Sequence, residues 1–164
     1  MNSKRITTNA FLVALTIVIL YLNFILPIST ISILTLSSFI IPITLIRNSV
    51  KDAILVYISS SIISFFLIPL NISLMYIGFF GIYGLIKYFI EKLNKLYLEV
   101  FLKLLFFNFI FLLGFLFFKA FFPISIIKIS IWLFIILSEI IFLVFDYALT
   151  LLISFYLEKL HKRI

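Results

Sequence analysis

The sequence contains no cysteine and only one histidine in 164 residues. The lack of cysteine excludes a disulfide bond and a thiolate metal site. The one histidine, His161, lies in a basic C-terminal tail with no second histidine to pair with, so we interpret it as an interfacial residue rather than a metal ligand or a base. Acidic residues do not cluster at ligand spacing either. We therefore expect neither a cofactor nor an enzymatic activity.

Charged residues are also scarce, and they divide the chain into long apolar runs. Thirteen Lys/Arg and six Asp/Glu stand against 65% hydrophobic residues. A helix needs about 20 apolar residues to cross a hydrocarbon core about 30 Å thick. The sequence predicts an all-α, polytopic membrane protein with a single membrane domain over 1–164 and six transmembrane helices, at 6–26, 31–46, 52–69, 72–91, 100–122 and 129–157.

The basic residues determine the expected orientation of these six helices. Positive charge is retained on the cytoplasmic side during insertion. With both termini inside, eleven of the thirteen Lys/Arg are cytoplasmic, and only Lys119 and Lys128 face outward. The sequence therefore predicts cytoplasmic termini and a cytoplasmic connector at 92–99, with 27–32, 68–72 and 120–128 on the outer side.

The excess of positive charge also indicates the partners. A formal net charge of +7 would favour nucleic acid in a soluble protein. Here the cations flank apolar helices, where positive-inside sorting and contact with anionic lipid account for them. We therefore expect the lipid bilayer as a partner and no nucleic acid.

Lys4 and Arg5 before an apolar run are typical of a signal peptide, but no small-x-small cleavage site follows, so we interpret this run as a retained first helix.

Proline and glycine mark two irregular places. Pro42 lies within the short second stretch and removes a backbone donor, so we expect a kink there, covered by neighbouring helices. Gly78, Gly81 and Gly84 fall within the fourth stretch at i, i+3 and i+6. They do not follow a strand, so they form no nucleotide-binding loop. We interpret them as bare backbone against which another helix of the chain packs closely, with a ligand as the alternative.

The longest polar segment connects the fourth and fifth stretches. The pairs Lys87/Glu91, Lys95/Glu99 and Glu99/Lys103 are each four residues apart, the spacing of ion pairs on a helix surface. We therefore expect these two helices to extend past the bilayer and to carry paired surface charges. A solvated amphipathic connector is the favoured interpretation, and a docking element is the alternative.

Polar residues inside the last two stretches are candidates for a ligand site. A charge at bilayer depth is costly, so it needs a partner or a purpose. Lys119, near the outer end of the fifth stretch, lies at a depth from which it could pair with Glu139 of the sixth. Trp132 lies near the same level. We interpret this group as the mouth of a site for a small ligand, with a structural ion pair as the alternative.

A second carboxylate lies deeper in the sixth stretch. Asp146 follows Glu139 by seven residues, about two turns, so both share one helix face. Asn108 of the fifth stretch and Tyr83 of the fourth are its expected hydrogen-bond partners, and both are further candidates for the ligand site. A structural clamp and a functional group are equally open for Asp146.

Two alanines in the first helix give the clearest motif. Ala10 and Ala14 form a small-xxx-small pair, which lets helices approach closely in a membrane. With six short-looped helices, both termini inside and this Ala-x-x-x-Ala pair, the chain resembles the substrate-binding S component of energy-coupling-factor (ECF) vitamin transporters. The layout matches along nearly the whole chain, but only Ala10 and Ala14 match a family motif residue by residue.

The resemblance implies a function and partners. It implies that Ala10 and Ala14 dock onto a shared transmembrane coupling subunit driven by two ATPases, in the cytoplasmic membrane of a bacterium. It also implies capture of a small molecule in the outer half of the later helices. Few polar residues lie there, so we expect a rather apolar ligand. Bacterial cell-shape proteins of the MreD family have a similar layout, and a structural scaffold of a cell-envelope complex is therefore the alternative.

Overall fold

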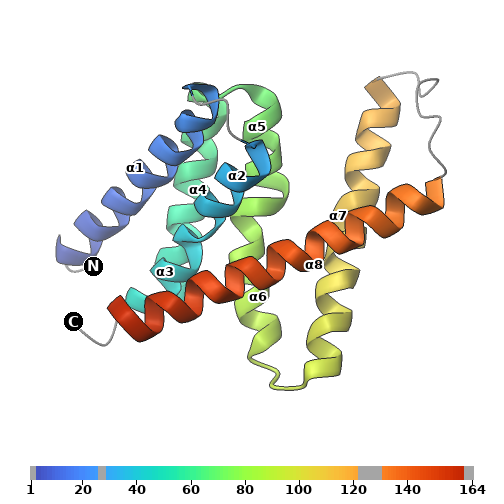
Figure 1. Ribbon diagram of the computed structural model, residues 1–164. Coiled ribbons are helices and arrows are strands. Elements are labelled where there is room, and N and C mark those ends of the chain that lie inside the picture. The colour runs from blue at the N-terminus through green and yellow to red at the C-terminus, as the bar shows by residue number, and fades with distance from the viewer. Residues whose placement is uncertain (1–2, 26–28, 122–130, 161–164) are drawn as a thin grey trace. The chain divides into compact units, whose positions relative to one another are not determined.

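A computed structural model describes the backbone of residues 3–25, 29–121 and 131–160 (Figure 1). Every element in these ranges is helical, and η1 and η2 are π-helical turns. In chain order the elements are α1 (Ser3–Ile25), α2 (Thr30–Ser38), α3 (Ile40–Arg47), α4 (Val50–Leu67), α5 (Leu70–Met75), η1 (Tyr76–Phe80), α6 (Gly81–Glu91), α7 (Leu96–Phe121), α8 (Ile131–Phe155) and η2 (Tyr156–Leu160).

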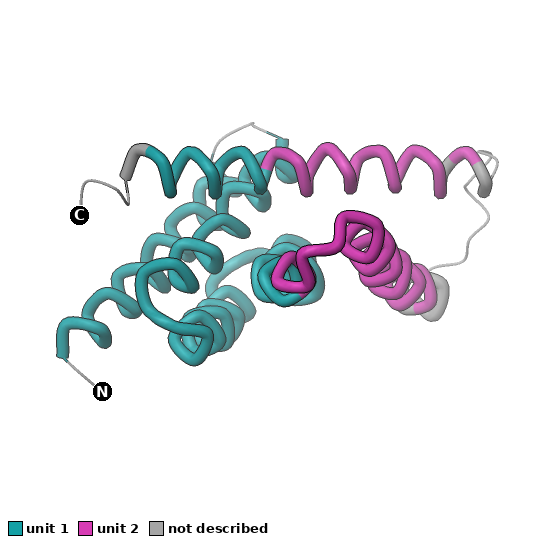
Figure 2. Tube along the Cα trace, turned by 90° about the horizontal axis from the view of Figure 1, so that it is seen from below, with its two compact units in different colours: residues 1–89, 149–164 teal, residues 90–148 magenta. Residues whose placement is uncertain are grey.

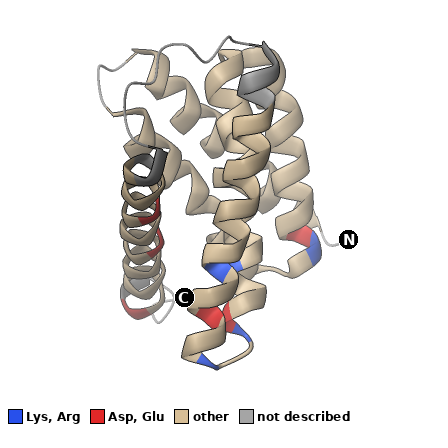
Figure 3. Cartoon of the chain, turned by 90° about the vertical axis from the view of Figure 1, so that its right-hand side faces the viewer, with Lys and Arg blue, Asp and Glu red and all other residues tan. Residues whose placement is uncertain are grey.

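Six helical stretches of the described chain are long and apolar enough to cross a membrane. They are Ser3–Ile25, Thr30–Arg47, Val50–Leu67, Leu70–Glu91, Leu96–Leu116 and Ile135–Glu158. Each overlaps one of the six predicted stretches, so the prediction of an all-α chain with six apolar helices is confirmed. Most of the ribbon carries no charged residue (Figure 3), and the architecture fits a multi-pass membrane protein.

The chain divides into two compact units (Figure 2). Unit 1 comprises 1–89 and 149–164, and unit 2 comprises 90–148. The first boundary falls within α6 and the second within α8, so each of these helices contributes residues to both units. The expected single membrane domain over 1–164 stays a prediction.

Unit 1 is built around α1, α4 and the broken helix α2–α3. The buried side of α1 follows a helical period of three or four residues, with Asn9, Leu12, Thr16 and Leu20 on one face. Two apolar clusters form the core of this unit. One contains Leu12, Ile40, Ile41, Ala53, Val56 and Leu85, and the other contains Leu20, Leu34, Ile68, Ile72 and Tyr76.

The second helix is interrupted one turn before Pro42, where the sequence predicts a kink. Helix α2 ends at Ser38 and α3 begins at Ile40. Pro42 has no amide hydrogen to donate to the carbonyl of Ser38, four residues earlier, so the regular ladder stops there. The amide of Phe39 donates a hydrogen bond to the Leu36 carbonyl at 3.2 Å, so a backbone hydrogen bond is still made at the interruption. The expected cover is also present, because α6 approaches Pro42 at Gly84.

The fourth predicted helix is not α-helical throughout, because the π turn η1 lies between α5 and α6, and this changes the role of its glycines. A Cβ at Gly84 would lie 2.7 Å from Cδ of Pro42, and one at Gly81 would lie 2.9 Å from the ring of Tyr57, so both glycines permit close packing within unit 1. Gly78 is exposed, with no described atom within 4 Å of its Cβ position. The packing prediction is therefore confirmed for two glycines and wrong for Gly78. The π turn η1 contains Gly78, and its wider spacing breaks the i, i+3, i+6 row.

Hydroxyl groups hold the π turn against α4. The Tyr57 hydroxyl donates to the Ile77 carbonyl within η1 at 2.7 Å, and the hydroxyls of Ser60 and Tyr76 lie 2.8 Å apart. Tyr76 is fully buried. In a membrane, a departure from α-helical hydrogen bonding is tolerated where protein groups satisfy the backbone, and Tyr57 supplies such a group here.

Candidate functional site: an apolar groove and two polar clusters

A groove runs along the outer surface of unit 1 between α1 and α4. Its volume is about 690 Å³, and it is open along its length. Ala10 and Ala14, the pair singled out by the sequence, are both exposed and both line it. The full lining is Ile6, Asn9, Ala10, Val13, Ala14, Ile17, Val18, Leu55, Val56, Ser59 and Ile63.

The groove exists because small side chains occupy the edge where the two helices diverge. Leu12 and Thr16 point into the core of unit 1, whereas Ala10 and Ala14 leave the neighbouring strip of α1 nearly bare. Ser59 is the small residue on the α4 side. A surface of this kind admits another helix to near backbone contact.

At one end of the groove, a polar network fastens α1 to the α3–α4 turn. The Asn48 amide donates to the Asn9 side-chain oxygen at 2.7 Å, and the Asn9 amide donates to the Asp52 carboxylate at 2.7 Å. The Ser49 hydroxyl donates to the second carboxylate oxygen, and the Arg5 guanidinium lies 3.1 Å from the same atom. The network satisfies Asp52 and fixes the start of α1 beside the start of α4.

The sequence contained part of the signal for this network. Ser49 precedes Asp52 by three residues, the spacing of a helix N-cap, and the Asp52 amide does donate to the Ser49 hydroxyl at 3.3 Å. Asn9 gave no such signal, because its partners are about 40 residues away. Only the packing of α1 on α4 reveals it.

Unit 2 contains a buried cation between two carboxylates. The ammonium of Lys103 on α7 lies 2.8 Å from the Glu91 carboxylate at the end of α6 and 3.1 Å from the Asp146 carboxylate of α8. Lys103 is only 8% exposed. The prediction that Lys103 is a solvated surface charge is therefore wrong. A lysine inside this helix contact loses its hydration and takes two carboxylates in exchange.

The helices on both sides of the connector reach close to it, and a second lysine there is also buried. Helix α6 continues to Glu91, and α7 begins at Leu96. Within unit 1, Lys87 is 1% exposed and donates to the Thr150 hydroxyl at 2.8 Å. The interpretation of Lys87 as a solvated charge is also wrong, because its long side chain turns inward to a polar group that the neighbouring helix presents.

Asn108 contacts a different carboxylate from the one expected. Its amide donates to Glu139 at 3.3 Å rather than to Asp146. The reason is the antiparallel register of α7 and α8, in which the rings of Phe107 and Phe142 stack with centroids 4.6 Å apart. In this register Lys103 reaches Asp146, and Asn108 lies near Glu139.

The expected ion pair between Lys119 and Glu139 stays a prediction. The side chains of Lys119 and Trp132 lie outside the described set, and their role at a ligand mouth stays a prediction.

Tyr83, the other expected partner of Asp146, is fully buried and stacks on Phe79 with ring centroids 5.5 Å apart. It belongs to unit 1, whereas Asp146 belongs to unit 2, and a hydrogen bond between them stays a prediction. The described residues contain no group of three or more His, Cys, Asp or Glu able to hold a metal ion.

No protein-family model matches this chain, and neither the curated proteins nor the solved structures give a significant match. The contacts within each unit are therefore the basis for a functional conclusion.

Proposed function

We propose that the chain is a membrane-embedded subunit that docks on a helix of a second membrane protein through the α1–α4 groove. The observation that carries this proposal is the exposure of Ala10 and Ala14 along an open apolar groove. Alanines that served only internal packing would be covered by the chain's own helices. In an S-component-like protein the occupant is the transmembrane coupling subunit with its two ATPases.

The cargo in this proposal is a small, rather apolar molecule captured on the side opposite the N-terminus. Glu139 is half-buried and accepts from the exposed Asn108, so a polar pair on α7 and α8 is available to orient a ligand in apolar surroundings. Lys119, Trp132 and Asp146 are the further candidates for this site.

A scaffolding role in a cell-envelope complex is the second candidate function. The observation that favours it is the pairing within unit 2, where Lys103, Glu91 and Asp146 satisfy one another. Such a cluster can fasten helices together without a ligand. Both functions use the groove, and they differ in the partner and in the need for a cargo.

The orientation in the proposal has both termini and the α6–α7 connector in the cytoplasm. Because the chain has no cysteine, single cysteines can test it. A Lys95→Cys protein should react with a membrane-impermeant maleimide only after the cells are opened, since basic connectors stay inside. An Asn71→Cys protein, with its cysteine in an expected outer connector, is the matched control and should react in intact cells. Reaction of Lys95→Cys from outside would reverse the topology.

Ala14→Leu is expected to abolish association with the partner while leaving the fold intact. Ala14 is exposed, so the larger side chain meets no internal neighbour, but it fills the strip that a docked helix must occupy. The measurement is recovery of a coupling subunit with two ATPases, or of a cell-envelope complex, with tagged protein from the native membrane.

Phe11→Trp is the matched control for docking, because Phe11 is an exposed α1 residue outside the groove lining. It adds volume and should leave association unchanged. If Ala14→Leu and wild type recover the same partner equally, the groove is not the docking surface.

A further inference from the structure

We propose that the α1–α4 groove binds an anionic phospholipid, with its phosphate at the start of α1 and α4 and one acyl chain along the groove. This inference goes beyond the docking function and holds whether or not a partner helix later displaces the lipid. Three observations carry it. The first is the positive charge around one end of the groove, and the second is the length of the groove. The third is the polar network that lies between the charged end and the apolar lining.

The charge at this end of unit 1 is strongly positive. Lys4 and Arg5 begin α1, while Arg47 and Lys51 flank the α3–α4 turn, and all four are exposed. Asp52 is the only acidic residue among the first 90 residues of the chain. The Arg5–Asp52 ion pair brings the starts of α1 and α4 together, so these cations share one end of the unit.

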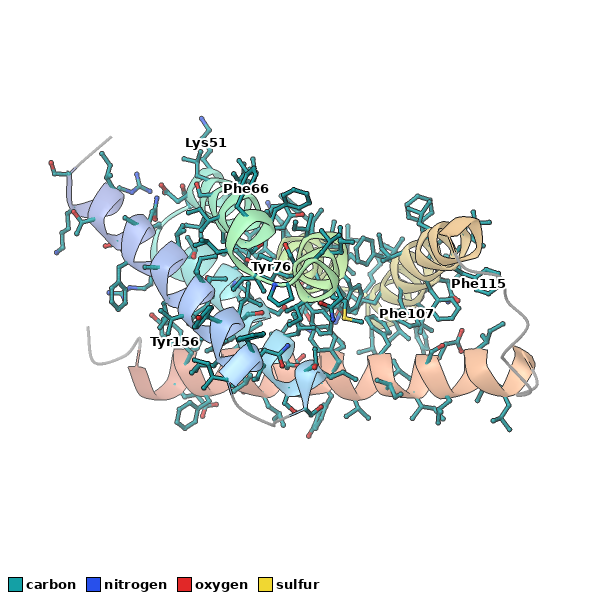
Figure 4. All side chains as sticks on the ribbon, turned by 90° about the horizontal axis from the view of Figure 1, so that it is seen from above. Lys51, Phe66, Tyr76, Phe107, Phe115 and Tyr156 are labelled. Atoms are coloured by element: carbon teal, nitrogen blue, oxygen red, sulfur yellow. The ribbon has the colours of Figure 1, made fainter. Side chains whose placement is uncertain are left out.

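The headgroup position follows from how these cations are held. The Arg5 guanidinium is oriented by the carboxylate of Asp52 at 3.1 Å, and Lys51, the residue before Asp52, projects away from the helices (Figure 4). Basic side chains at a membrane interface attract anionic headgroups. Asp52 can neutralise only one of the four cations, so a net positive charge remains to attract an anion from outside the chain.

The groove has the length of one lipid chain. It extends from Ile6 to Val18, thirteen residues whose Cα atoms span about 18 Å of helix. Half of a bilayer core about 30 Å thick is about 15 Å, the depth of one leaflet. An acyl chain that starts at the cationic end therefore fills the groove and ends near its far end.

The polar network keeps the two parts of the site distinct. Asn9 lines the groove, but its amide nitrogen and oxygen are engaged by Asp52 and Asn48. Beyond Asn9 the lining is apolar except for Ser59. The charged end therefore adjoins the apolar groove, and Asn9 between them has its polar atoms satisfied. This arrangement matches a phospholipid, in which a charged headgroup adjoins an apolar acyl chain.

The test is a lipid titration of purified protein in non-ionic detergent, with bound lipid counted by native mass spectrometry. Phosphatidylglycerol should bind as one molecule per chain and more tightly than phosphatidylcholine with the same acyl chains. Removing two cations in Lys4→Gln/Lys51→Gln should weaken phosphatidylglycerol binding roughly twenty-five-fold, at roughly five-fold for each cation. Lys92→Gln/Lys95→Gln, with the same charge change in the α6–α7 connector, should bind as the wild type does.

Groove-filling variants separate a seated lipid from surface attraction. Ala14→Phe and Val18→Trp both fill the groove from exposed positions, and each should reduce phosphatidylglycerol binding. Glycerol 3-phosphate should not displace the lipid, because the acyl chain supplies part of the affinity.

Equal binding of the two lipids, or unchanged binding in both filled variants, would overturn the proposal. Lys4→Gln/Lys51→Gln should still recover the partner protein, so failure of the lipid site and failure of docking are distinguishable.

Discussion

Replacing Lys103 by methionine is expected to lower the free energy of unfolding by about 3 kcal/mol. Methionine keeps the apolar part of the side chain as far as Cε but removes the cation that Glu91 and Asp146 share. Breaking a buried ion pair from one side typically costs about 3–5 kcal/mol, since the other charge stays buried without its counter-charge. We expect the lower end of this range, because the Glu91 side chain is 37% exposed and water can compensate part of the loss.

Thermal or denaturant unfolding in mixed micelles measures this effect. Lys95→Met removes the same charge from an exposed position in the α6–α7 connector and should change stability by less than about 0.5 kcal/mol. Glu91→Gln should cost less than Lys103→Met, because Lys103 keeps Asp146 as its partner. A Lys103→Met protein as stable as the wild type would show that the cluster does not hold α7 and α8 together.

Gly84→Leu is expected to destabilise unit 1 by about 3 kcal/mol, the upper end of the usual range for overpacking. Its Cβ would meet Cδ of Pro42 at 2.7 Å and Cβ of Ile41 at 3.2 Å. Neither atom is the end of a flexible side chain, so the backbone of α3 or α6 has to move. Pro42 is rigid and already marks the break between α2 and α3, which limits how far α3 can adjust.

Gly114→Leu provides the matched control. Gly114 lies in α7 with no described atom within 4 Å of its Cβ position. There leucine should be neutral or stabilising by up to about 1 kcal/mol, because it is a better helix former than glycine. Equal destabilisation by Gly84→Leu and Gly114→Leu would mean that contact with α3 does not determine the result, because Gly114→Leu creates no such contact.

The helices were predictable from the sequence because they depend on short-range patterns. Apolar runs of about 20 residues and the donor missing at Pro42 are visible without any tertiary contact. The packing of Gly81 and Gly84 was also visible, as small residues on a spanning helix. The π turn at Tyr76–Phe80 was not, because the hydroxyl of Tyr57 that supports it comes from α4, about twenty residues earlier.

The polar contacts were less predictable, because they depend on helix register. Asp146 and Glu139 were recognisable as residues in need of partners, but the sequence did not indicate Lys103 as a partner of Asp146 or Asn108 as a partner of Glu139. A shift of one or two turns between α7 and α8 exchanges every such pairing. Likewise, a spacing of four residues made Lys103 resemble a surface charge, and only its 8% exposure shows that it faces inward.

Burial of Lys103 also links this chain to the thickness of its membrane. Only fifteen residues of α7 separate Lys103 from Lys119, the next charged residue, and they extend about 22 Å. A typical hydrocarbon core is about 30 Å thick. In a bilayer of this thickness, either the lipid thins around α7 or the Lys103 cluster lies inside the hydrocarbon. Both arrangements cost free energy, and the cost rises in a bilayer of longer acyl chains. In a bilayer, the ion cluster would thereby make the short charge-free part of α7 sensitive to hydrophobic mismatch.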